Sequence, residues 1–136
     1  MILKRNGLSK LERLHSRKQM DELFSHGRSV RQGPLKFIFV ETALKTDLPS
    51  EFMFTVSKRQ FKRAHDRNYI KRLLREVFRV NKHQINDYLI SQQKGMQGCF
   101  LFLGTQKPTY ANLEKNILRI FAQLMPQENE MDQSAN

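Results

Sequence analysis

The chain has 136 residues, which is enough for one domain and too few for two ordinary hydrophobic cores. Its hydrophobic content of 39% supports a small buried core and excludes a chain disordered by composition. The 24 Lys and Arg residues outnumber the 13 Asp and Glu residues, giving a net charge of +11 at pH 7. So basic a domain favours a polyanionic partner. Nucleic acid is the usual one, because each neutralised phosphate releases counterions, and an anionic membrane surface is the alternative.

Cysteine usage and hydropathy give an expectation for the cellular location. Cys99 is the only cysteine, so an intramolecular disulfide is excluded. It lies in the apolar run 98–104, where a small buried hydrophobe is expected. The apolar start, residues 1–3, is too short for a signal peptide, and no apolar run reaches the length of a membrane span. We therefore expect a cytoplasmic protein with no membrane partner.

In chain order, residues 1–13 predict a partly ordered basic arm and residues 14–125 a single domain. Residues 126–136 predict a disordered acidic tail. The domain begins with a helix signal at Ser16, which with Gln19 forms a weak capping box. Met20, Leu23 and Phe24 follow at helical spacing, and Gly27 is a plausible residue for the end of this helix.

The next segments predict strands. Residues 35–40 and 51–57 are rich in aromatic and β-branched residues, and residues 42–50 predict the loop between them. A turn is predicted at Gly33 and Pro34, with a weak strand signal before it at 29–31.

Two further helices and one strand complete the domain. Asp66 is predicted to cap an amphipathic helix that ends near Asn81, with its apolar stripe formed by Ile70, Leu73, Leu74, Val77 and Phe78. Residues 82–97 are polar. Residues 98–103 predict a buried strand, and Pro108–Thr109 opens a last helix. The order predicts an α+β, two-layer sandwich, with one sheet and helices mainly on one face.

The central helix carries the strongest functional signal. Residues 58–82 contain ten Lys or Arg and only two acids, Asp66 and Glu76. On a helical wheel the cations lie opposite the apolar stripe. A solvated charged face usually alternates in sign, whereas here like charges stand four residues apart at Lys71/Arg75 and Arg75/Arg79. Arginine predominates, and its planar guanidinium binds phosphate through two hydrogen bonds and stacks on bases. This face predicts an RNA-binding surface.

The segment Lys62–Arg79, KRAHDRNYIKRLLREVFR, resembles the signature segment of the bacterial ribonuclease P protein family. That family carries an Arg-Asn-Arg element before a Lys-Arg-Leu-x-Arg-Glu helix. Tyr69 stands here in place of the second Arg of the element, where it either stacks on a base or covers the helix. The resemblance extends over roughly residues 8 to 124.

The resemblance implies a fold like domain 2 of ribosomal protein S5, with a mixed sheet and a left-handed βαβ crossover. It also implies a function. The protein would be a subunit of the endoribonuclease ribonuclease P and would assist removal of the 5′ leader from precursor tRNA, one protein per RNA. Hydrolysis would belong to the catalytic RNA with Mg²⁺, with no catalytic residue, metal site or cofactor on the protein alone.

The resemblance also implies two binding surfaces. A cleft between the first helix and the sheet would take the single-stranded leader and would be lined by Met20, Phe24, Phe37 or Phe39. Which strand phenylalanine faces that cleft stays open. The face toward the catalytic RNA would comprise Lys58, Arg59, Lys62, Arg63, Arg67, Asn68, Lys71, Arg72, Arg75 and Arg79.

Other functions are weighed against this one. A ribosomal protein of the same fold is disfavoured by the segment from Arg67 to Glu76. A protein ribonuclease would need His65, which lies in the basic loop, but the acids are scattered and show no metal-ligand spacing. A membrane-surface module would need the apolar face of the central helix, which the core already requires.

Overall fold

The computed structural model describes residues 17–44 and 49–125, and its side chains from residue 21 onward. The predicted arm, tail, Ser16 cap and the side chains of Gln19 and Met20 lie outside this part. The elements are α1 (Arg17–His26), β1 (Arg28–Gln32), β2 (Leu35–Ala43), β3 (Ser50–Val56), α2 (Ala64–Ser91), β4 (Lys94–Phe102) and α3 (Tyr110–Leu124).

The four strands form one mixed sheet in the order β1-β2-β4-β3. β1 and β2 make an antiparallel hairpin, whose turn places Gly33 at a φ of 57°. β4 pairs antiparallel with β2 and parallel with β3. Because β3 and β4 are parallel neighbours, the chain must cross over between them, and α2 makes that connection. The predicted α+β fold with a mixed sheet is confirmed, including the weakly signalled first strand.

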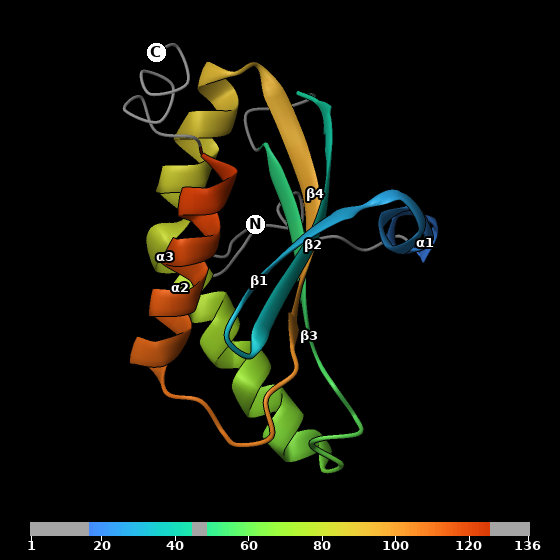
Figure 1. The fold of residues 1–136 in the computed structure, drawn as a ribbon, viewed down its shortest axis with the longest axis vertical. Helices are drawn as coiled ribbons and strands as arrows, with labels where there is room; N and C mark the ends of the chain where they lie inside the picture. The colour runs from blue at the N-terminus through green and yellow to red at the C-terminus, as the bar shows by residue number, and fades with distance from the viewer. Residues whose placement is uncertain (1–16, 45–48, 126–136) are drawn as a thin grey trace, which may run out of the picture.

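The sheet separates the helices into two unequal layers. α2 and α3 cover one face, and α1 lies on the other (Figure 1). Alternate residues of β2 follow this division. Leu35 and Phe37 belong to the core under α2 and α3, while Ile38 and Val40 pack with Leu23 of α1 on the opposite face.

Phenylalanine rings fill the centre of the larger core. The ring of Phe37 lies 4.3 Å from that of Phe100 and 5.1 Å from that of Phe52, measured between centroids. Phe52 in turn lies 5.1 Å from Phe78 of α2. A Cβ atom at Gly98 would overlap the ring of Phe37, so this glycine lets the ring lie against β4. The rings thus connect β2, β3 and β4 to α2.

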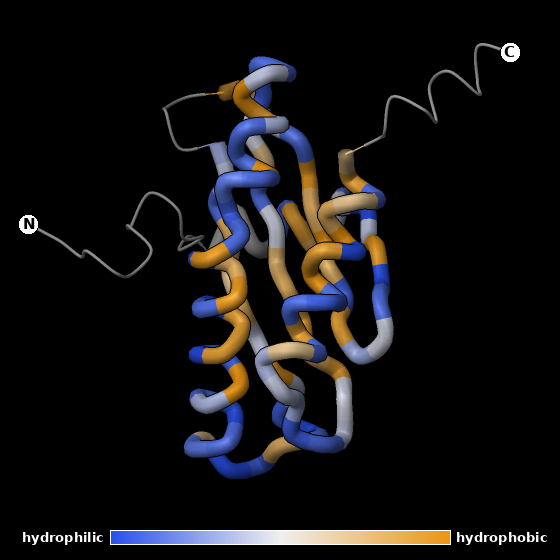
Figure 2. The backbone as a smooth tube through the Cα atoms, turned by 90° about the vertical axis from the view of Figure 1, so that its left-hand side faces the viewer, coloured by the Kyte–Doolittle hydropathy of each residue, from blue (hydrophilic) through white to orange (hydrophobic). Residues whose placement is uncertain are grey.

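The central helix is longer than predicted. It runs from Ala64 to Ser91, with Arg63 rather than Asp66 at the N-cap position. Its apolar stripe continues through the buried side chains of Ile85 and Leu89, so the predicted end near Asn81 was wrong. The intervening polar residues occupy the solvent side of the same helix, which made the segment resemble a loop (Figure 2).

β4 also begins earlier than expected, at Lys94 rather than residue 98. Its first half contains glycine and glutamine, which weaken a strand prediction, but it is enclosed between β2 and β3. Burial raises the pKa of the Cys99 thiol to about 12, as expected for a small buried hydrophobe.

The predicted start of α3 is correct. The hydroxyl oxygen of Thr109 caps this helix by accepting a hydrogen bond from the backbone N–H of Asn112.

The ring cluster predicts a large difference between two phenylalanines. Phe37→Ala removes a ring with no exposed surface and should lower the free energy of unfolding by about 3–5 kcal/mol. Phe24→Ala removes a ring that is 51% exposed and should cost less than about 1 kcal/mol. Urea unfolding followed by circular dichroism measures both. Equal losses would contradict the placement of Phe37 at the centre of the core.

Candidate RNA interface

The predicted cationic surface lies on the loop between β3 and α2 and on the first half of α2. Lys58, Arg59, Lys62 and Arg63 of the loop are exposed. On the helix, Asn68, Arg72 and Arg75 are also exposed, whereas Lys71 and Arg79 are half-buried. Since Ile70 and Leu74 are fully buried on the other side, α2 has little freedom to rotate. The core therefore holds this face outward.

Arg67 has a different environment from the other arginines. Its guanidinium donates hydrogen bonds to the backbone carbonyls of Phe61, at 2.7 Å, and Lys62, at 2.8 Å. Phe61 is 8% exposed, and its N–H donates to the carbonyl of Ser57. Arg67 therefore holds the basic loop against α2. The sequence prediction missed this role, because the loop carbonyls that accept from Arg67 leave no side-chain pattern.

Asp66 joins the start of α2 to the loop before α3. Its carboxylate lies 3.0 Å from Nζ of Lys107 and 3.7 Å from Nδ1 of His65. The hydrogen bond from Lys107 holds the pKa of Asp66 below its usual value of 3.8. Asp66 stays ionised and positions Lys107 beside α2. His65 also contacts this carboxylate.

Tyr69, at the position where the resemblance implies an arginine, lies in a hollow on this surface. The hollow has a volume of about 370 Å³ and is lined by His65, Asn68, Tyr69, Arg72 and Arg75. The Tyr69 side chain remains partly exposed, with the guanidinium of Arg72 5.9 Å and Nζ of Lys107 6.0 Å from its ring centroid. A flat ring flanked by two cations suits a base and its phosphate.

Glu76 reduces the like-charge repulsion that the sequence predicts along α2. Its carboxylate accepts two hydrogen bonds from Arg79, at 3.1 Å and 2.5 Å, which hold the pKa of Glu76 below its usual value. Arg79 is therefore partly neutralised within the protein. It is a weaker candidate for phosphate than Arg72, for which the structure gives a ring contact and no carboxylate contact among the described residues.

The prediction for the second binding surface needs correction. Phe37 is 0% and Phe39 5% exposed, and both side chains lie in the core with α2 and α3. They do not line a surface beside α1, because the strand alternation points them to the opposite face. The residues that cluster with Leu23 of α1 are Cys99, Ile38, Val40 and Met53. Phe24 is exposed, as a ligand contact requires, and the side chain of Met20 lies outside the described part.

Two other functional classes would need a metal site or a membrane-spanning helix within residues 17–44 and 49–125. Within these ranges no three His, Cys, Asp or Glu side chains come together in a way that would hold a metal ion. None of the helices in the same ranges combines the length and the apolar character needed to cross a membrane.

Fold and surface together define a small, basic α+β protein of the type that binds nucleic acid. A family model described as ribonuclease P matches residues 8–125, and the chain belongs to this family. A ribonuclease P protein component from Porphyromonas gingivalis is 33% identical over 118 residues, covering 84% of this chain and 86% of that protein. One from Chlorobium phaeobacteroides is 30% identical over 125 residues, covering 85% and 86%.

Solved structures show the same fold. The ribonuclease P protein from Thermotoga maritima superposes with a TM-score of 0.66 at 21% identity, over 82% of this chain and 96% of that one. The protein from Staphylococcus aureus gives a TM-score of 0.62 at 16% identity, over 83% and 94%. Family membership makes the chain a protein subunit of the ribonucleoprotein endoribonuclease ribonuclease P, whose role is the processing of tRNA at the 5′ end.

The Asp66 contact predicts a specific pH dependence. A depressed pKa in the folded state stabilises the fold above the unfolded pKa, and this contribution is lost as the pH falls through the folded value. The difference in free energy of unfolding between the wild type and Asp66→Asn should therefore be largest near neutrality and shrink below about pH 4. Urea titrations at several pH values measure it. Asp87→Asn removes an exposed carboxylate from the same helix and serves as the matched control. A difference that does not change with pH would contradict the assignment.

Proposed function

We propose that the chain binds the catalytic RNA of ribonuclease P through the loop 57–63 and the outward face of α2. One observation carries the proposal. A helix locked into the core by one face presents exposed arginines on the other, next to a loop with four exposed cations. Neutralising RNA phosphates releases counterions and relieves the repulsion among these cations. Arg67 contributes by holding the loop rather than by contacting RNA directly.

The 5′ leader of precursor tRNA is proposed to bind on the opposite side of the sheet, beside α1. Phe24 supplies an exposed ring for stacking, and Met20 remains a candidate from the sequence. Phe37 and Phe39 are replaced in this proposal by the residues of β2 that face the same side as α1. Ile38 offers an apolar contact, and the half-buried Lys36 offers a cation for phosphate. The catalytic RNA and the leader would then lie on opposite sides of the domain, the first on the outward face of α2 and the second beside α1 (Figure 1).

Hydrolysis is assigned to the RNA subunit with Mg²⁺, and the protein's role is electrostatic and positional. Two polyanions, the catalytic RNA and the precursor tRNA, must approach closely, and a protein of charge +11 between them lowers their repulsion. One protein copy per catalytic RNA suffices, because each binding surface is contained within a single chain.

Reconstitution tests this function directly. At low Mg²⁺, a bacterial ribonuclease P RNA should cleave a precursor tRNA at the mature 5′ end only when this protein is added. Extra Mg²⁺ also lowers the repulsion between the two RNAs. At high Mg²⁺, adding the protein should therefore increase the cleavage rate less. Cleavage by protein alone would assign the chemistry to residues such as His65. Tight RNA binding without stimulation would instead favour the ribosomal alternative.

The leader surface makes a second prediction. Phe24→Ala should weaken binding of a precursor tRNA with a single-stranded leader to the reconstituted complex by roughly tenfold, since one stacked base contributes about 1–3 kcal/mol. Binding of mature tRNA, which has no leader, should be unchanged. Ile90→Ala removes a side chain of similar exposure, 44%, from α2 and is the matched control. Equal loss for both tRNAs would contradict a leader contact at Phe24.

A further inference from the structure

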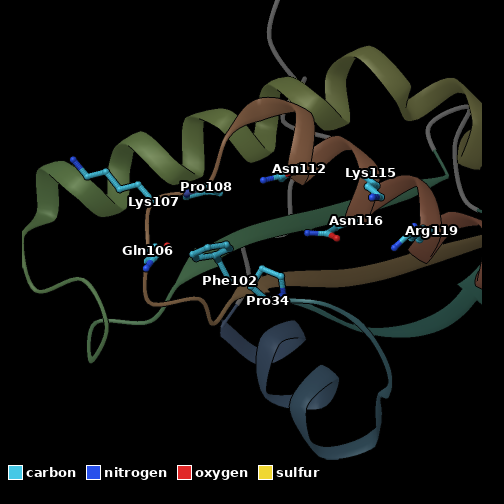
Figure 3. Close-up of a pocket in the computed structure, with 9 residues that line it drawn as sticks. All are labelled: Pro34, Phe102, Gln106, Lys107, Pro108, Asn112, Lys115, Asn116 and Arg119. Carbon is cyan, nitrogen blue, oxygen red and sulfur yellow. The ribbon is translucent and has the colours of Figure 1, made fainter.

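A second polar pocket lies between α3 and the turn that joins β1 to β2 (Figure 3). Its volume is about 330 Å³. Asn112, Lys115, Asn116 and Arg119 project into it from one side of α3, and Pro34 and Phe102 lie across from them. Gln106, Lys107 and Pro108 complete the lining. The pocket is separate from the hollow beside Tyr69.

The lining has the composition of a nucleotide site. It contains three cations, of which Lys107 is paired with Asp66 of α2, together with three amides and no carboxylate. The acid on this stretch of α3, Glu114, is directed elsewhere, because its carboxylate accepts a hydrogen bond of 2.9 Å from the Asn81 amide on α2. A merely solvated helix face would usually alternate charges. The excess of cations here suits a phosphate, and the amides suit base edges.

The wall opposite α3 is apolar and close to backbone. Pro34 is half-buried, and the Phe102 ring is almost fully covered. At Gly33 the chain turns with φ of 57°, and a Cβ there would stand 3.5 Å from Oδ1 of Asn116. The turn therefore brings backbone and the Pro34 ring near the amides of α3. An apolar wall facing amides and cations can take a base or ribose on one side and polar contacts on the other.

The pocket continues the surface proposed for the catalytic RNA. Lys107 lines it and also binds Asp66 of α2 at 3.0 Å, with its Nζ 6.0 Å from the Tyr69 ring centroid. α3 lies in the same layer as α2, on the far side of the sheet from α1 (Figure 1). An RNA strand on α2 can therefore pass over Lys107 to α3, whereas a leader beside α1 is separated from the pocket by the sheet.

We propose that this pocket binds one nucleotide of the catalytic RNA, with Lys115 and Arg119 on its phosphate and Asn112 and Asn116 on its base or ribose. The inference rests on the proposed function and extends the RNA-binding surface from α2 to α3.

The test compares two double variants that each remove one Lys and one Arg. Lys115→Gln/Arg119→Gln changes the pocket. Arg28→Gln/Lys94→Gln changes two cations that both contact Glu41, near the other end of the β2–β4 ladder. Affinity for a bacterial ribonuclease P RNA is measured at several salt concentrations, after thermal unfolding has shown that both variants fold. The pocket variant should bind roughly tenfold more weakly, and the slope of log affinity against log salt should fall by about 0.7, because one phosphate is no longer neutralised.

The control variant should keep the wild-type slope. If both variants lose affinity equally, only net charge matters and the pocket proposal is overturned. If the wild type itself does not bind the RNA, the proposed function fails first, so the two failures are distinguishable.

Crosslinking locates the nucleotide independently. Asn112→Cys keeps all three cations and can carry a photoreactive label, while the native thiol at Cys99 is buried with a pKa of about 12 and should not react. Crosslinks to a discrete position of the catalytic RNA would support the proposal. Crosslinks to precursor tRNA alone, or spread evenly over the RNA, would overturn it.

Discussion

The rotation of α2 about its own axis is the constraint on which the binding surface depends. Stacked and edge-on rings connect β2, β3 and β4 to Phe78, and Ile70 and Leu74 are buried in the same core. Rotating the helix would expose these side chains, each of which contributes about 1.5–3 kcal/mol by burial. The cations on the other face are therefore held outward by apolar packing and not by their own contacts. This explains how a face of like charges persists in the free protein.

The acids near this face are arranged so that they do not cancel it. Asp66 binds Lys107, Glu76 binds Arg79, and Glu114 accepts from Asn81. These contacts leave Arg72 without a carboxylate partner among the described contacts. Exposed ion pairs contribute little to the free energy of unfolding. Their main effect is on how the positive electrostatic potential is distributed over the surface of α2 and the basic loop. The acids shape the ends of the surface and leave its centre positive.

The sequence predicted the first half of α2, whose two faces differ clearly, and failed to predict the orientation of β2, whose faces do not differ. The stripe of α2 up to Phe78 was predictable because apolar residues recur with helical spacing, and the start of α3 was predictable because Pro108 and Thr109 are typical of a helix start. The orientation of β2 was not, because Phe37, Ile38, Phe39 and Val40 are all apolar, and a period of two then marks no inner face. Only the register with β4, where Phe37 pairs with Phe100 at the cross-strand position, decides which rings are buried. The role of Arg67 was equally hidden, since its partners are backbone carbonyls.

A fold stabilised by rings and a surface made of exposed cations can be altered separately. The ring cluster is buried, whereas cations such as Arg72, Lys115 and Arg119 are exposed, so changing these cations should affect RNA binding with little effect on stability. Arg67 and Asp66 are exceptions, because one holds the basic loop and the other holds Lys107 against α2. Loss of RNA binding on changing either one reports a displaced loop as well as a lost charge. The surface should therefore be mapped with residues such as Arg72, Lys115 and Arg119, whose contribution to binding can be measured without moving the backbone that carries the neighbouring cations.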